Sequence, residues 1–213
     1  MADFEKDLVV LVADLDMETT IRGLLDHRIR SFDINVPPTY DIFRHLQRDP
    51  GCLNDSPNFL RNFSRKYERA LVLFDHEGSG AENKSIEIIQ TNLENQLAAN
   101  GWNANRVRVI VIDPELEIWV WSGSTKTLDC LGWGEHTTTE FWQAISNFQK
   151  HTKLTDKPHK PARPKEAMEW ALRQKKKARS AAIFAQLAKE ISFKRCTDTS
   201  FQRLSDTLKS WYG

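Results

Sequence analysis

Residues 70–80 of the chain, ALVLFDHEGSG, decide the fold class because they join a short apolar run to an acidic, glycine-containing loop. The first five residues are apolar without alternation, which is typical of a strand buried on both faces of a parallel sheet. Asp75 and Glu77 follow this run directly. The stretch therefore predicts a buried strand with acidic side chains at its carboxyl end.

Two further apolar runs, residues 8–12 (LVVLV) and 107–112 (VRVIVI), have the same character. Between the runs, residues 16–27 and 85–100 carry apolar side chains at helical spacing. Strands that alternate with helices in this way predict an α/β fold. We expect a mostly parallel sheet of about four strands with helices on both faces.

The segments between these strong patterns give weaker signals. Residues 29–36 alternate weakly and predict a strand that a Pro-Pro pair would end. Residues 39–64 are expected to form two short helices around a loop, with residues 48–51 (RDPG) as a turn and residues 58–67 helical. Residues 122–137 are rich in glycine, serine and threonine and are expected to form a loop.

The chain divides by charge into an acidic and a basic part. Residues 1–150 carry 15 Lys and Arg against 23 Asp and Glu, whereas residues 151–213 carry 15 against 6. We expect an α/β domain over 1–150, a proline-containing linker or arm over 151–164, and a basic helical section over 165–213 with helices at 165–173, 179–191 and 201–211. The two parts either have separate electrostatic roles or simply attract each other.

Composition excludes several classes of protein. The 213 residues are 40% hydrophobic and 28% charged, which does not fit a disordered chain. No apolar run approaches the roughly 20 residues needed to span a bilayer, and the acidic N-terminus does not fit a secretory signal. The three cysteines lie far apart without a CxxC pair, which fits a reducing compartment. We therefore expect a cytoplasmic protein without a membrane segment.

Acidic residues follow all three strong strands. They are Asp14, Asp16 and Glu18 after the first, Asp75 and Glu77 after the second, and Asp113, Glu115 and Glu117 after the third. Ligands of open α/β sheets bind outside the carboxyl ends of the strands. Carboxylates that converge there are tolerated only if a cation neutralises them or some stay protonated. Oxygen ligands select a hard ion such as Mg²⁺ or Mn²⁺. The alternative is that these acids cap the helices that follow them.

Residues 70–102 also resemble the second half of a Toprim domain, the topoisomerase–primase fold. Asp75-His76-Glu77 matches the acid-x-acid pair of that fold, with Glu in place of the usual second Asp, and a glycine and a long helix follow. Residues 14–18 (DLDME) correspond to the first Toprim motif. Asp14 stands where the family has a glutamate, Leu15 replaces its glycine, and Glu18 stands at the helix acid.

Residues 109–121 (VIVIDPELEIWVW) narrow this resemblance to small Toprim-like proteins of bacterial defence and mobile-element operons. The layout of residues 164–201 is similar as well. The resemblance implies Mg²⁺- or Mn²⁺-dependent phosphodiester processing of a nuclease type, in antiviral defence. The alternative is a catalytically degenerate module that binds partner subunits, because Asp14-Leu15 replaces the Glu-Gly of the family.

The candidate site follows from the strand-end acids and the resemblance together. The candidate catalytic residues are Asp14, Glu18, Asp75 and Glu77, and the candidate metal ligands are Asp14, Asp75, Glu77, Asp113 and Glu115. Basic side chains would neutralise the phosphates of a nucleic acid. The candidates for that role are Arg48, Lys165, Lys175, Lys176, Lys177 and Arg179. The alternative for the lysine run is a solvated helix face.

Overall fold

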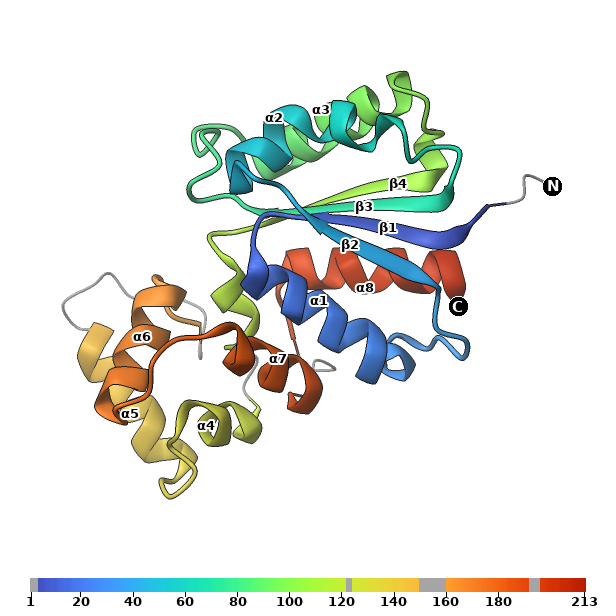
Figure 1. Cartoon of the computed structure of the whole chain (residues 1–213). Helices are drawn as coiled ribbons and strands as arrows, with labels where there is room; N and C mark the ends of the chain where they lie inside the picture. The colour runs from blue at the N-terminus through green and yellow to red at the C-terminus, as the bar shows by residue number, and fades with distance from the viewer. Residues whose placement is uncertain (1–3, 122–123, 150–159, 192–195) are drawn as a thin grey trace.

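A four-stranded, entirely parallel sheet forms the centre of the fold (Figure 1). The computed structural model describes residues 4–121, 124–149, 160–191 and 196–213. The strand order is β2 (Tyr40–Arg44), β1 (Lys6–Val12), β3 (Tyr67–Asp75), β4 (Val107–Ile112). The expected α/β class, with about four parallel strands and helices on both faces, is confirmed.

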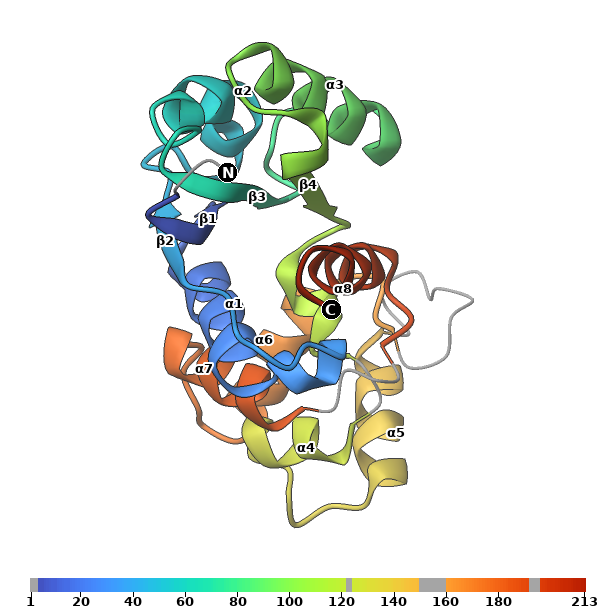
Figure 2. The ribbon, with the colours of Figure 1, turned by 90° about the vertical axis from the view of Figure 1, so that its right-hand side faces the viewer.

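The helices that connect the strands lie on opposite faces of the sheet. They are α1 (Leu15–His27), α2 (Arg48–Arg61) and α3 (Ile86–Ala99). The chain steps from β1 to β2 in one direction and then returns across β1 to β3 and β4. Because such crossovers are right-handed, the reversal moves the connecting helices to the other face. Figure 2 shows α2 and α3 above the sheet and α1 below it.

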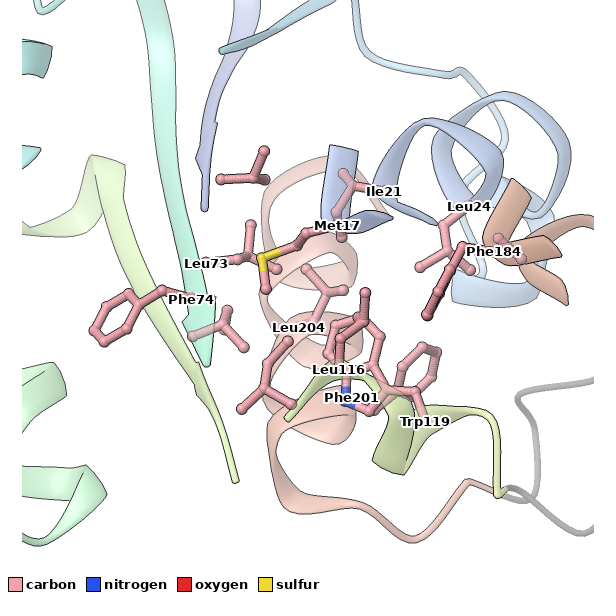
Figure 3. Packing of buried hydrophobic residues seen from close by; sticks show 14 of the residues in the cluster. Met17, Ile21, Leu24, Leu73, Phe74, Leu116, Trp119, Phe184, Phe201 and Leu204 are labelled. Carbon is pink, nitrogen blue, oxygen red and sulfur yellow. The ribbon is translucent and has the colours of Figure 1, made fainter. Parts of the chain in front are cut away.

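Helix α8 (Thr199–Tyr212) covers the rest of the face on which α1 lies. Its Phe201 and Leu204 point into a core that Met17 of α1 and Leu73 of β3 also enter (Figure 3). The Phe201 ring meets the Trp119 ring edge-on at 5.3 Å between centroids. Burial of each such side chain contributes about 1.5–3 kcal/mol. The last helix is therefore part of the sheet's own core.

Two side chains form hydrogen bonds with the outer backbone groups of the edge strand β4. Glu94 of α3 accepts a hydrogen bond from the Val109 N–H at 2.9 Å, and Arg203 of α8 donates to the Val109 carbonyl at 3.0 Å. Arg203 and Glu94 also form an ion pair at 2.7 Å. The backbone groups of Val109 that an added strand would use are occupied, which is a common protection of sheet edges.

The remaining helices form a second layer beside α1. They are α4 (Thr125–Leu131), α5 (Thr138–Gln149), α6 (Pro164–Gln174) and α7 (Ala181–Glu190). Helix α7 lies against α1 so closely that a Cβ built on Gly23 would approach the Ala188 Cβ to 2.8 Å. The helices expected near 165–173, 179–191 and 201–211 are confirmed as α6, α7 and α8.

Several local expectations are wrong. Residues 29–36 contain the 3-10 helix η1 (Ile29–Phe32), because Ile29 and Phe32 are both buried by a tight turn. The strand comes later, at Tyr40–Arg44, where half-burial along a sheet edge leaves a weak hydrophobic signal. Residues 122–137, expected as a loop, contain α4, which Ser124 caps at its start and Gly132 caps at its end.

The expected turn at residues 48–51 is instead the first turn of α2, which ends at Arg61. Proline is tolerated there because the first N–H groups of a helix have no partner within the helix. The helix expected over 58–67 therefore starts ten residues earlier, and Tyr67 opens β3.

Most of the expected linker, residues 151–159, lies outside the described residues, and Pro164 is the first residue of α6. In the described ranges, no helix has the length and apolar character required to cross a membrane.

Candidate functional site

An acidic crevice of about 400 Å³ lies at the carboxyl ends of β1 and β3. This is the point where the strand order reverses, and open α/β sheets bind their ligands there. Nine of the lining residues are acidic and three are basic. The acids are Asp14, Asp16, Asp49, Asp75, Glu77, Glu115, Glu117, Glu166 and Glu169, and the bases are Arg48, Lys165 and Arg179.

Four of these acids, called the open acids here, are Asp14, Asp49, Asp75 and Glu77. Asp14 caps α1 by accepting the Met17 N–H at 2.9 Å. Asp49 accepts the backbone N–H of Asp75 at 2.8 Å, and Asp75 accepts the Leu116 N–H at 2.9 Å. Among the described residues, no cation forms an ion pair with any open acid.

Three other acids, called the paired acids, are neutralised by cations from the C-terminal part of the chain. Lys165 of α6 lies 2.9 Å from Glu115. Arg179, just before α7, contacts Glu117 at 2.6 Å and Asp16 at 2.6 Å. Glu115 and Glu117 are 6% and 2% exposed, and carboxylates this deeply buried need such partners.

Burial and mutual repulsion raise the pKa values of several acids in the crevice. The pKa of Asp75 is raised well above its usual range by burial first, and then by Asp49, Glu117 and Asp14. Burial is also the largest cause of the raised pKa values of Asp49 and Asp16. Carboxylates in this state favour either a proton or a bound cation.

The structure brings together most of the predicted acids. Asp14, Asp75, Glu77 and Glu115 line the crevice. Asp113 does not, because its side chain is 57% exposed and contacts Nδ1 of His76 at 3.3 Å.

Glu18 also lies apart from the crevice. It pairs with Arg44 at 2.9 Å and with Arg22 at 3.1 Å, and it lines a neighbouring hollow. Its carboxylate is therefore already neutralised by two arginines of the chain.

Some of the predicted basic residues line the crevice and others do not. Arg48, Lys165 and Arg179 line the crevice. The run of three lysines, residues 175–177, does not: Lys175 lies over the Trp133 ring at 4.4 Å, and Lys177 donates to the Cys130 carbonyl at 3.3 Å. The lysine run thus packs against the α4 region.

Asp49 is the open acid that sequence reasoning missed, and Glu166 and Glu169 also line the crevice without having been predicted. Residues 48–51 carry turn residues, and the turn interpretation hid the start of a helix. The available signal was an acid directly before a proline, a pair that also fits the first turn of a helix. Asp49 lies in the segment that follows β2, and β1 lies between β2 and β3 in the sheet. Its carboxylate nevertheless accepts a hydrogen bond from β3.

The atoms that the open acids offer to a metal ion are all carboxylate oxygens, which suit a hard divalent cation. In the ranges that the structure describes, no three His, Cys, Asp or Glu side chains are already gathered as a complete ligand set. Neither a family, nor a curated protein, nor a solved structure matches the chain.

Proposed function

We propose that the chain is a Mg²⁺- or Mn²⁺-dependent phosphodiester-processing protein of a nuclease type. The observation that carries the proposal is the group of open acids at the switch point of the sheet. Four carboxylates line the crevice there without an ion-pair partner among the described residues, while neighbouring acids have one. Natural chains keep such destabilising arrangements mainly at functional sites.

Asp14, Asp75 and Glu77 are the proposed ligands, with Asp49 added by the structure. A divalent cation bound there would polarise a phosphoryl oxygen and favour attack by water. Backbone contacts fix the ligands, since Asp14 is held by the Met17 N–H and Asp75 by the Leu116 N–H. Arg48, at the rim of the crevice, would bind a substrate phosphate.

The setting in bacterial antiviral defence is part of the proposal. It rests on the resemblance of residues 14–18, 70–102 and 109–121 to Toprim-like proteins of defence operons. Nucleic acid is the proposed substrate, and partner proteins of a defence system are the proposed associates.

Cleavage assays test the proposal directly. The purified chain is incubated with end-labelled DNA and RNA in the presence of Mg²⁺, Mn²⁺ or a chelator. We expect cation-dependent cleavage that the double variant Asp75→Asn/Glu77→Gln abolishes. Asp113→Asn is the matched control, because Asp113 follows a strand in the same way but lies outside the crevice, and it should cleave normally. Equal loss in both variants would contradict the site.

A second candidate function is a degenerate module that binds partner subunits. It is favoured by Leu46 and Leu15, which are 99% and 46% exposed and line the hollow beside the crevice. Apolar side chains that are exposed side by side at a hollow can contribute to a contact surface. This candidate predicts that the Asp75→Asn/Glu77→Gln variant keeps its partners, and that the wild type has no cation-dependent activity.

A further inference from the structure

The turn after β2 and the first residues of α2, residues 45–49, cross the carboxyl end of β1. His45, which follows β2, donates its N–H to the Val12 carbonyl of β1 at 2.9 Å. Four residues later, Asp49 accepts the Asp75 N–H of β3. Strands β2 and β3 flank β1 in the sheet. The turn is therefore fixed at both ends and lies over the switch point.

Arg48 is presented by this turn in an unusual backbone conformation. Its φ angle is +51°, in the left-handed region that non-glycine residues rarely adopt and that costs about 1–3 kcal/mol. Such a conformation persists where the surroundings fix it, often at ligand sites. Among the described residues, Arg48 has no ion-pair partner, although the other two cations of the crevice, Lys165 and Arg179, do.

His45 holds the turn through its side chain. The ring is 8% exposed, and its Nδ1 accepts the Gln47 N–H at 3.1 Å. An acceptor Nδ1 leaves the proton on Nε2, which faces the Asp55 carboxylate at 3.3 Å. The ring lies on Gly51, where a Cβ would come within 1.8 Å of Nδ1. The imidazole is thus enclosed by the first turns of the helix that it positions.

A second hollow of about 690 Å³ continues the crevice toward β2. The two hollows share Asp14, Asp16, Arg48 and Arg179 as lining residues, so they adjoin along the edge of the sheet. A phosphodiester has a nucleotide on each side of the reacting phosphate. A site that processes it needs space on both sides, and the second hollow supplies the second space.

We infer that Arg48 binds a phosphate of a nucleic-acid strand that runs from the crevice into the second hollow, and that His45 is the positioning residue that holds Arg48 in place. The inference rests on the proposed function for the identity of the substrate. It adds a direction to the strand, across the ends of β3, β1 and β2. It also gives His45, whose ring is almost fully buried, the role of holding Arg48 in position.

Binding of a short fluorescent oligonucleotide, measured by anisotropy, tests the inference. Ca²⁺ is added because it also takes oxygen ligands. We expect Arg48→Ala to weaken binding about tenfold, as the loss of one charge-assisted contact does. Arg30→Ala is the matched control, because Arg30 is exposed and follows the far end of α1, and its affinity should stay within about twofold of the wild type.

A pair of substitutions separates positioning by His45 from simple packing. His45→Asn keeps an acceptor near the place of Nδ1 for the Gln47 N–H, whereas His45→Gln extends toward Asp55 and loses that acceptor. We expect His45→Gln to weaken oligonucleotide binding about fivefold to tenfold, and His45→Asn to recover most of it. In a cleavage assay, the loss in His45→Gln should fall on KM more than on kcat.

Gly51→Ala sharpens the test, because alanine favours the helix by about 1 kcal/mol but its Cβ would displace the imidazole. We expect weaker binding from this variant. Thermal unfolding of every variant verifies that the chain is folded.

Several results would overturn the inference. They are wild-type affinity in Arg48→Ala, equal affinities in His45→Gln and His45→Asn, or no oligonucleotide binding by the wild type. Failure of the proposed function gives a different result. In that case the wild type neither binds Mn²⁺ nor cleaves, but Arg48→Ala still weakens oligonucleotide binding.

Discussion

The open acids and the paired acids lie in one crevice and differ in where their neutralising charge comes from. Glu115, Glu117 and Asp16 contact Lys165 or Arg179, which belong to the C-terminal third of the chain. Asp14, Asp49, Asp75 and Glu77 have no such partner among the described residues. Carboxylates in the same crevice therefore have different roles. The paired acids join the C-terminal helices to the sheet, whereas the open acids store repulsion that an external cation would relieve.

The largest expected effect concerns the paired acids. Arg179→Met should lower the free energy of unfolding by about 3 kcal/mol, because it leaves the buried Glu117 without a counter-charge. Urea denaturation measures the loss. Arg173→Met is the control, since its partner Glu169 is partly exposed and the pair is worth less than about 1 kcal/mol. Equal losses would show that burial of Glu117 does not matter.

The open acids should respond in the opposite direction. Without a divalent cation, Asp75→Asn should raise the free energy of unfolding by on the order of 1 kcal/mol, because it removes a buried charge beside Asp49 and Asp14. With Mn²⁺ present, the wild type should gain stability and the variant should not. Melting curves with and without Mn²⁺ measure both effects, and a destabilised, metal-responsive variant would contradict the comparison.

The pH dependence of stability should reflect the raised pKa values of the acids in the crevice. Asp75, Asp49 and Asp16 have pKa values raised in the folded state, so the folded chain binds more protons than the unfolded chain above about pH 4. Stability from these groups is therefore present at low pH and lost as the pH rises through their folded pKa values. Urea midpoints from pH 4.5 to 8 should fall without metal, and Asp75→Asn should flatten the slope. A slope unchanged by that substitution would assign the effect elsewhere.

The smallest expected effect is that of Asp113→Asn. The side chain is more than half exposed, so its contact with His76 contributes about 0.5 kcal/mol or less. Stabilisation by Mn²⁺ should match that of the wild type in a parallel melting experiment. A large loss of that stabilisation would mean that Asp113 belongs with the open acids.

The parallel sheet could be predicted from the sequence because three of its strands are nearly continuous apolar runs. The edge strand at Tyr40–Arg44 could not, since each of its residues keeps some contact with solvent. Because that edge strand is only half-buried, its hydrophobic pattern is weaker than that of residues 29–36, which were therefore predicted as the strand instead. Hydrophobic pattern reports burial, and an edge strand is only partly buried.

Convergence of Asp14, Asp75 and Glu77 could be predicted because side chains at the ends of neighbouring parallel strands share one edge. The contribution of Asp49 could not, because it depends on a turn that crosses over β1. The ion pairs of the paired acids could not be predicted either, namely those that Glu115 and Glu117 form with Lys165 and Arg179. It depends on how the C-terminal helices return to the sheet, and no local pattern encodes that contact.

Calorimetric titration of Mn²⁺ into the metal-free chain tests the central claim most directly. We predict one site of micromolar or tighter affinity in the wild type. Glu115→Gln, a substitution among the paired acids, should retain the site, and Asp14→Asn/Asp75→Asn, a substitution among the open acids, should lose it. Absence of binding by the wild type, or binding that survives the loss of the Asp14 and Asp75 carboxylates, would contradict the account.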